Sequence, residues 1–236
     1  MRWLAGGSTV TVGVVGDAAD VIETLESTGR STVVGSPTTV ARADPSTIVT
    51  VGEEALLATA RERLDVPILA VGTDIGPAAS DRAAIREALS KGVEREQPLI
   101  DVSVGGESVS TALLDVMLVT SEPARISEYA IDHDDGRVAA FRADGVVVAT
   151  PAGSEGYAAT AGGPTIDAGA DALCAVPIAP FHTQSTRWVL DTSPLTLSVL
   201  RDEGSVSLLV DDDEHGPIGS GQAVRLAVDG FVRTLH

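Results

Sequence analysis

The chain has 236 residues, of which 44% are hydrophobic and only 3% are aromatic, so its core must be built mainly from Val, Leu, Ile and Ala. Its 34 acidic and 16 basic residues give a net charge of −18, which disfavours nucleic acid as a partner because its phosphates would be repelled. Its apolar runs are shorter than the roughly 18 residues that a membrane-spanning helix needs, so we expect no membrane partner either.

The first part of the sequence alternates between strand and helix patterns. Val-rich apolar runs predict strands over 9–15, 31–34, 47–51 and 68–71. Apolar residues at helical spacing predict helices that run from the cap Asp17 to Gly29, through Leu56–Leu64, and over Asp81–Gly92. Alternation of this kind implies a parallel sheet covered by helices, and we assign residues 1–97 to an α/β nucleotide-fold domain.

Beyond residue 97, short β-type runs replace the alternating pattern. The expected strands are 99–104, 112–119, 124–131, 138–141, 146–149, 172–178, 187–190, 195–200, 206–210 and 223–228. Turn signals such as Asp202-Glu203-Gly204 and Gly216-Pro217 separate them. We therefore predict a mostly antiparallel β domain over residues 98–236.

The densest local signal is the segment Asp144-Gly-Val-Val-Val-Ala-Thr-Pro-Ala-Gly-Ser-Glu-Gly-Tyr157, which continues to Ala161-Gly-Gly-Pro164. It is an apolar strand that runs into small residues and a turn. Small residues allow a ligand to approach the backbone, whose N–H groups can hold phosphate or ribose oxygens. The alternative is a Gly-rich turn that begins a short helix and binds nothing.

This segment resembles the signature of the NAD kinase family, D-G-x-x-x-x-T-P-T-G-S-T-A-Y followed by A-G-G-P. Other segments align with the family in the same order. They are Thr50-Val-Gly-Glu-Glu-Ala-Leu-Leu57 for G-G-D-G-T-L-L, Ala112-Leu-Leu-Asp115 for A-L-N-E or A-L-N-D, and Val176-Pro-Ile-Ala-Pro180 for T-P-I-C-P. The resemblance covers nearly the whole chain and implies the same order of an α/β domain and a β domain.

The resemblance implies transfer of the γ-phosphate of ATP to the 2′-hydroxyl of the NAD adenosine ribose, with Mg²⁺ as the divalent cation. In the family the Asp of G-G-D-G supplies the catalytic carboxylate, and Glu53 holds that position here. The implied cofactor-binding residues are Gly52, Glu54, Asp115, Asp144, Thr150, Gly153, Ser154, Glu155 and Tyr157. The β domains of the family commonly build subunit interfaces, which implies a homo-oligomer whose partners are small-molecule nucleotides.

Several positions depart from the family pattern. Glu54 replaces a glycine and brings bulk and negative charge beside the polyphosphate, Leu114 replaces an Asn that contacts the dinucleotide, and Glu155 replaces a Thr. Glu53 and Glu54 can also be read as first-turn helix residues that the helix dipole favours. Two alternatives therefore stand beside an active kinase: a catalytically degenerate relative that binds a nucleotide or a partner subunit without turnover, and a scaffold that binds no ligand.

Other features carry less functional information. Lys91 is the only lysine in this acidic chain, which is typical of a halophile, and the single Cys174 fits a reducing cytoplasm. The four histidines show no metal-ligand spacing. Ser154 resembles a nucleophile elbow only loosely, because Ala152 stands where a Gly is needed. The run Asp211-Asp-Asp213 is expected to be a solvated acidic turn.

Overall fold

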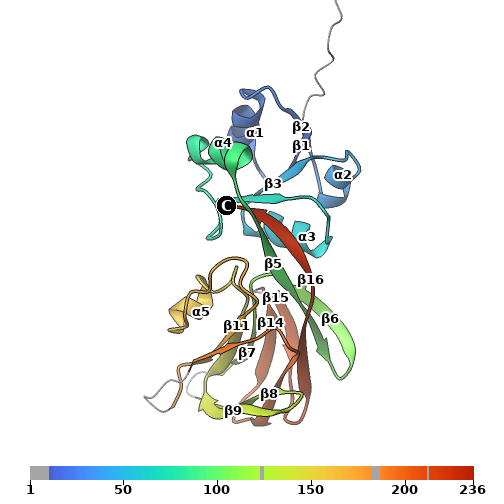
Figure 1. Ribbon diagram of the computed structural model, residues 1–236. Helices are drawn as coiled ribbons and strands as arrows, with labels where there is room; N and C mark the ends of the chain where they lie inside the picture. Colours follow the sequence, from blue (N-terminus) through green and yellow to red (C-terminus); the bar gives the residue numbers. More distant parts are fainter. Residues whose placement is uncertain (1–10, 123–124, 182–186, 212) are drawn as a thin grey trace, which may run out of the picture. The chain divides into compact units, whose positions relative to one another are not determined.

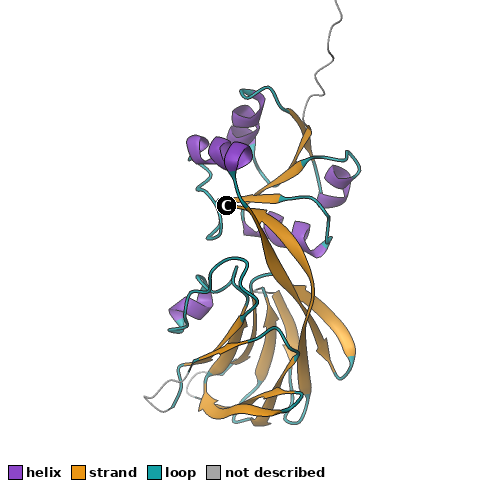
Figure 2. Cartoon of the chain, viewed as in Figure 1, coloured by secondary structure: helices purple, strands orange, loops and turns teal. Residues whose placement is uncertain are grey.

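The computed structural model describes residues 11–122, 125–181, 187–211 and 213–236, and these divide into two compact units. The first unit contains the chain up to Arg95 together with Val232–His236, and the second contains Glu96–Phe231. Helices are concentrated in the first unit and strands in the second, as Figures 1 and 2 show. The strand starts expected at residues 9 and 124, and the middle of the acidic run at 212, lie outside the described residues.

The first unit is built on a parallel sheet with the strand order β2-β1-β3-β4 (Figure 1). The end of β16 joins it, because Thr234 pairs in parallel with Ile68 of β4. The strands are β1 (Thr11–Val15), β2 (Ser31–Val34), β3 (Thr47–Val51) and β4 (Ile68–Val71), and the helices are α1 (Ala19–Glu26), α2 (Pro37–Ala41), α3 (Glu53–Arg61) and α4 (Arg82–Lys91).

Alternation along the strands of the first unit supplies apolar side chains to both faces of the sheet. One face packs Val12, Val14, Val49, Leu69 and Val71 against Val21 and Leu25 of α1 and Ile85 of α4. The opposite face packs Val15 and Ile48 against Val40 of α2 and Ala55 of α3. The sheet is therefore buried on both sides, as a parallel sheet requires.

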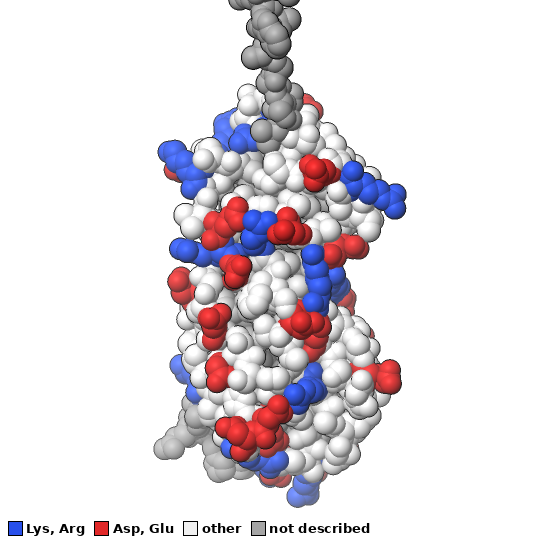
Figure 3. All heavy atoms as spheres, turned by 45° about the vertical axis from the view of Figure 1, so that its right-hand side comes forward, with Lys and Arg blue, Asp and Glu red and all other residues white. Residues whose placement is uncertain are grey.

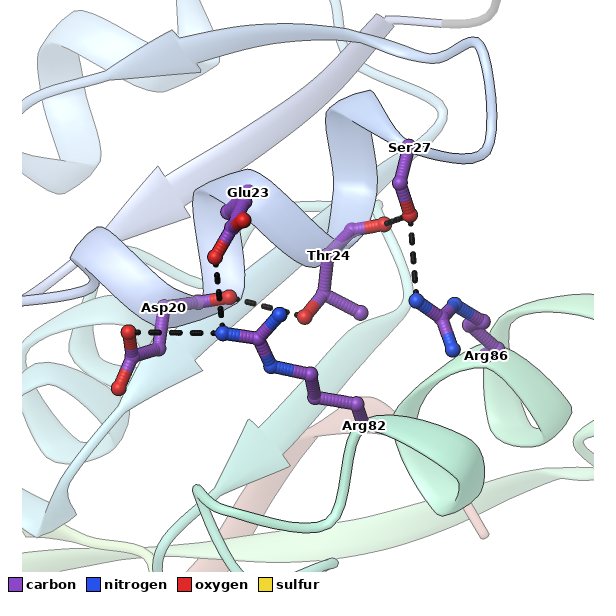
Figure 4. A network of polar contacts seen from close by, with 6 residues as sticks. All are labelled: Asp20, Glu23, Thr24, Ser27, Arg82 and Arg86. Carbon is purple, nitrogen blue, oxygen red and sulfur yellow. Dashed lines mark hydrogen bonds and ion pairs between the residues drawn. The ribbon is translucent and has the colours of Figure 1, made fainter.

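Helices α1 and α4 are also joined by polar contacts on the surface (Figure 4). Arg82 donates to Glu23 at 2.8 Å, and Arg86 donates to the Ser27 hydroxyl at 3.2 Å. Asp81 caps α4 by accepting a hydrogen bond from the Ala84 amide. The expected cap at Asp17 is wrong, since α1 begins at Ala19 without a side-chain cap.

The second unit contains two β-sheets. One has the order β12-β11-β10-β7-β14-β15 with antiparallel pairs, and the other runs β9-β8-β13-β16-β5-β6. Their strands are β5 (Glu94–Val104), β6 (Glu107–Ala112), β7 (Asp115–Thr120), β8 (Ser127–His133), β9 (Gly136–Ala143), β10 (Gly145–Ala149), β11 (Leu173–Ile178), β12 (Trp188–Leu190), β13 (Leu195–Arg201), β14 (Val206–Val210), β15 (Asp213–Pro217) and β16 (Ala223–Leu235).

The core of the second unit lies between these two sheets. Val116, Leu118, Val146 and Val148 of the first sheet pack there with residues of the second sheet such as Leu197. The other face of the first sheet is covered by the segment that contains α5 (Tyr157–Thr160). The expected fold class, a parallel α/β unit followed by a mostly antiparallel β unit, is confirmed.

Some boundaries differ from expectation. The apolar run 112–119 does not form one strand: it is divided between β6 and β7, with Leu113 and Leu114 between them. Gly216-Pro217 ends β15 instead of forming a turn, and the short helix α2 was not predicted. In the part of the chain that the structure describes, no helix is long and apolar enough to cross a membrane.

Acidic and basic side chains are interspersed on the face shown in Figure 3. Several of them form exposed ion pairs. Arg225 binds both oxygens of Asp134 at 3.0 and 3.2 Å, and Arg233 contacts Asp65 and Glu94 at 2.7 and 2.8 Å. Exposed pairs of this kind contribute little individually because water and salt screen them.

Candidate nucleotide site

In the first unit, each parallel strand runs directly into a glycine: Gly16, Gly35, Gly52 and Gly72. Since parallel strands share one carboxyl edge, these turns lie along the edge at which open α/β sheets bind ligands. The turn after β1 packs closely on the end of β3, because a Cβ on Gly16 would lie 2.5 Å from the Val51 carbonyl oxygen.

The predicted phosphate loop begins at Gly52, whose φ of +84° favours glycine. Its amide donates to the Val71 carbonyl at 2.9 Å, which ties the loop to β4. Glu53 and Glu54 follow as the first residues of α3, and both are exposed. Their position in the first helical turn agrees with the dipole interpretation and leaves both carboxylates accessible to a ligand.

In the second unit, the turn after β10 is joined directly to the backbone between β6 and β7. The Thr150 hydroxyl donates to the Leu113 carbonyl at 2.5 Å and lies 3.2 Å from the Leu114 carbonyl. The Thr150 amide also donates to the Leu114 carbonyl, at 2.9 Å. The same hydroxyl accepts a hydrogen bond from the Gly153 amide at 3.2 Å. Thr150 is fully buried, so its polar groups organise the turn.

Gly153 is required by packing within the protein. A Cβ at this position would lie 2.0 Å from the carbonyl oxygen of Leu114 and 2.4 Å from its carbonyl carbon. From the sequence alone, this glycine is expected to let a ligand approach the backbone. The structure shows that it admits another segment of the chain, the Leu113–Asp115 segment.

The remaining side chains of the turn divide between buried and exposed. The Ser154 hydroxyl is buried, donates to the Pro151 carbonyl at 2.8 Å and accepts from the Ile166 amide at 2.9 Å. It is therefore a poor candidate for a nucleophile. Glu155 is exposed, and Tyr157 is 42% exposed, so these two side chains are the ones that the turn presents to solvent.

The expectation that Asp211 lies in a solvated acidic turn is wrong. Asp211 is 5% exposed, and its carboxylate accepts hydrogen bonds from three successive amides, those of Leu113 at 3.0 Å, Leu114 at 2.7 Å and Asp115 at 3.2 Å. The Asp211 amide donates in return to the Asp115 carbonyl at 3.0 Å. The backbone of the segment is thus held by Asp211 on its N–H side and by Thr150 on its carbonyl side.

Comparison with known proteins identifies the family. Residues 113–228 match the model of the ATP-NAD kinase C-terminal domain. An NAD kinase of Methanosarcina mazei is 34% identical over 137 residues, which are 58% of this chain and 47% of that protein. An NAD kinase of Methanospirillum hungatei is 27% identical over 192 residues, which are 78% of this chain and 71% of that protein.

Residues 113–228 belong to the NAD kinase family, as its C-terminal domain. The chain spans about half the length of the Methanosarcina relatives that it matches. Its fold resembles that of an NAD kinase from Archaeoglobus fulgidus in complex with ATP, with a TM-score of 0.72 and 20% identity over 96% of this chain and 93% of that one. The yeast NADH kinase complexed with NADH gives a TM-score of 0.75 and 14% identity over 96% and 83% of the two chains.

The NAD kinase signature is divided between the two ends of β10. Asp115 pairs with Ala149, so it lies at the same end as Thr150. Asp144 precedes the other end, where its carbonyl accepts from the Thr120 amide at 2.8 Å. The five residues of β10 separate Asp144 from Thr150, and six steps of about 3.3 Å along a strand give about 20 Å. The two predicted NAD-site carboxylates are therefore well apart within one chain.

Asp115 lies on the outer face of its sheet, in a row with Ala149 and Cys174. It is 7% exposed. The pKa of the Cys174 thiol is raised mainly by burial and further by the charge of Asp115. This end of the sheet is therefore buried and apolar, and it contains the charge of Asp115.

The structure assembles one group of candidate site residues in the second unit: Leu114, Asp115, Thr150, Gly153 and Asp211. Glu53 and its loop belong to the first unit. The resemblance implies that both motifs serve one ligand, so Gly52–Ala55 is expected to approach Thr150–Tyr157, and this stays a prediction. Among these residues Asp211 is not expected from the sequence motifs described above. One signal for it exists: NAD kinases often carry V-D-G-Q near the C-terminus, and Val210-Asp211 matches the first half of that pattern.

Proposed function

We propose that this protein is an NAD kinase, which transfers the γ-phosphate of ATP to the 2′-hydroxyl of the NAD adenosine ribose to give ADP and NADP. The observation that carries the proposal is the ordered turn at Thr150–Tyr157, which carries the family signature and is bonded to the Leu113–Asp115 segment, the second family motif. The relatives named NAD kinase, and the solved neighbours with ATP and with NADH, support the same substrates.

Glu53 is the proposed catalytic carboxylate. It follows Gly52 at the carboxyl edge of the parallel sheet and is exposed, so a ribose hydroxyl can reach it. The carboxylate would accept the proton of the 2′-hydroxyl as that oxygen bonds to the γ-phosphorus, while the bond between this phosphorus and the oxygen of ADP breaks. Backbone N–H groups of the loop would hold the polyphosphate. Such contacts matter because phosphoryl transfer depends almost entirely on positioning and electrostatics.

Mg²⁺ is the proposed cation. Within the described residues, no group of three or more His, Cys, Asp or Glu side chains could hold a metal ion by itself. Mg²⁺ is usually bound through one or two carboxylates together with substrate phosphates, and the exposed pair Glu53 and Glu54 fits that requirement. When bound, the cation would neutralise charge on the polyphosphate. Glu54 would then be a ligand instead of a source of repulsion.

The second unit is proposed to bind NAD. Tyr157 is 42% exposed and offers a ring and a hydroxyl, Glu155 is exposed two residues before it, and Asp115 supplies a carboxylate at the same end of the sheet. Thr150, Gly153 and Ser154 act by shaping the turn, since their polar groups are satisfied within the protein. Asp144 lies at the far end of β10, so it would contact a distant part of a dinucleotide or a molecule bound to another subunit of a homo-oligomer.

A nucleotide-binding relative without turnover is the second candidate. The comparisons with known proteins favour the kinase, and two departures from the family pattern motivate this alternative: Glu54 places a second carboxylate where polyphosphate would bind, and Leu114 lacks the amide that the family uses toward the dinucleotide. Repulsion between unit charges at 4 Å is about 1 kcal/mol in water and several times larger in a partly desolvated site. This candidate predicts that NAD stabilises the protein although no NADP forms.

Glu53→Gln separates the two candidates. For a kinase that uses Glu53 as its base, we expect the rate of NADP formation to fall by about 10²–10⁴-fold, the usual contribution of a general base. Glu62→Gln is the matched control, because Glu62 is an exposed carboxylate at the other end of α3. Equal rates in wild type and Glu53→Gln would reject the assigned role. NAD-dependent stabilisation without NADP formation in any of the three proteins would favour the second candidate.

A further inference from the structure

The Leu113–Asp115 segment is an irregular connection at a predicted ligand site, yet its backbone groups are bonded on both sides. The carbonyls of Leu113 and Leu114 accept from Thr150, and the amides of the whole segment donate to Asp211. Side chains, and not the hydrogen-bond pattern of a helix or strand, satisfy these backbone groups. The segment therefore depends on two side chains that are distant in sequence.

We propose that Asp211 is a positioning residue for the dinucleotide site, which acts by fixing the backbone of Leu113–Asp115. One of its carboxylate oxygens accepts from Leu113, and the other accepts from both Leu114 and Asp115. A carboxylate is the acceptor that suits this arrangement, because it can take several amide donors and its charge strengthens each bond. An amide side chain would turn an NH₂ group toward one of the donors.

The backbone at Asp211 is consistent with this role. Asp211 follows β14, whose last residue Val210 pairs with Val116 of β7, and it turns away with a φ of +48°. Positive φ is unfavourable for a residue with a Cβ, although Asp tolerates it better than most. This conformation places the carboxylate within hydrogen-bond distance of the three amides of the segment. Asp211 is only 5% exposed, so water does not compete for these amides.

The consequence concerns Leu114 and Asp115, the two residues of the segment that the family resemblance assigns to the dinucleotide site. Leu114 is partly exposed and Asp115 is the predicted NAD-site carboxylate, so the direction of both side chains is set by a backbone that Asp211 holds. Asp211 itself would not touch NAD. Its loss should therefore weaken NAD binding, while ATP binding, which is proposed to involve the Gly52 loop of the other unit, is unchanged. This consequence rests on the proposed function, whereas the fixing of the backbone does not.

The test compares wild type, Asp211→Asn, and Asp134→Asn as a control. Asp134 is an exposed carboxylate in the same unit that binds Arg225. Hydrogen exchange of individual amides should be at least tenfold faster at Leu113, Leu114 and Asp115 in Asp211→Asn, with no change at 116–118 of β7. In steady-state kinetics the KM for NAD should rise about tenfold, with the KM for ATP unchanged.

Several outcomes would overturn the inference. Wild-type exchange at the three amides of Asp211→Asn would show that Asp211 does not hold the segment. Equal rises in the KM for NAD and for ATP would show a general loss of structure. If Asp211→Asn does not fold, Asp211→Glu keeps the charge but displaces it, and should give the same pattern more weakly; wild-type behaviour would reject the inference. If wild type forms no NADP, the proposed function fails, and the exchange measurement alone decides whether Asp211 holds the segment.

Discussion

Gly153→Ala should be among the most destabilising small substitutions in the second unit. The added methyl group would lie 2.0 Å from the carbonyl oxygen of Leu114, 2.4 Å from its carbonyl carbon and 2.8 Å from its Cα. All three atoms belong to a backbone that is hydrogen-bonded to Thr150 and Asp211, so moving them would disrupt these hydrogen bonds. The turn or the segment must shift, and bonds between them must lengthen.

The magnitude follows from two contributions. Overpacking a rigid contact costs about 1–3 kcal/mol. Each lost hydrogen bond of Thr150 costs about 1 kcal/mol, and Thr150 donates two to the segment, one from its hydroxyl to the Leu113 carbonyl and one from its amide to the Leu114 carbonyl. We therefore expect unfolding to become about 3–5 kcal/mol more favourable, which corresponds to a fall in Tm of roughly 10 °C for a domain of this size.

Urea and thermal unfolding of the whole chain, followed by circular dichroism, measure this effect. Gly156→Ala is the matched control in the same turn. Its Cβ would meet only the Gly153 carbonyl at 3.4 Å, but its φ of −81° and ψ of −126° lie outside the regions that alanine favours, so we expect a loss of about 1–3 kcal/mol from backbone strain without a steric clash, smaller than that of Gly153→Ala. A Gly153→Ala protein as stable as wild type would refute the reasoning, and so would an equal loss in Gly156→Ala.

Three other predictions test the site and the composition. Glu54→Gly should raise the rate of NADP formation if Glu54 repels polyphosphate; a lower rate and weaker Mg²⁺ dependence across a Mg²⁺ titration would show instead that Glu54 is a metal ligand. Because burial raises the pKa of the Cys174 thiol, its contribution to the free energy of unfolding should be fully present below the pKa of the unfolded thiol, about 8.5. That contribution should be lost as pH rises above this value. The matching measurement is the free energy of unfolding between pH 7 and 10, and rapid thiol labelling of the native protein at pH 8 would contradict burial. With a net charge of −18, the Tm should rise as KCl is increased from 0.1 to 2 M, and a falling Tm would argue against a protein adapted to high salt.

The parallel sheet was predictable because its strands are short runs of Val and Ile that end in glycine. The runs of β1, β3 and β4 are largely buried and carry a strong apolar signal, whereas β2 at the edge of the sheet is partly exposed. The class of the antiparallel unit was predictable for a different reason, since turn residues separate its short apolar runs. Boundaries were less certain where an apolar run continues through a bend, as it does at Leu113 and Leu114 between β6 and β7.

The role of Asp211 could not be predicted from local pattern. Three neighbouring aspartates are usually solvated, and only contacts with residues 96–98 positions away distinguish the buried one. The packing role of Gly153 was hidden for a similar reason, because a glycine in a turn has the same sequence signature whether a ligand or another backbone approaches it. In both cases the deciding partner is a segment that is remote in sequence.

The central claim is tested most directly by following the γ-phosphate. The purified chain is incubated in molar KCl with Mg²⁺, NAD and ATP labelled at the γ-phosphate, and the nucleotides are separated and counted. The account predicts that the label appears in NADP in proportion to enzyme concentration and that Glu53→Gln reduces it by at least 10²-fold, the lower end of a general-base contribution. NADP formation no greater than in an enzyme-free control, from protein that NAD and ATP still stabilise, would contradict it.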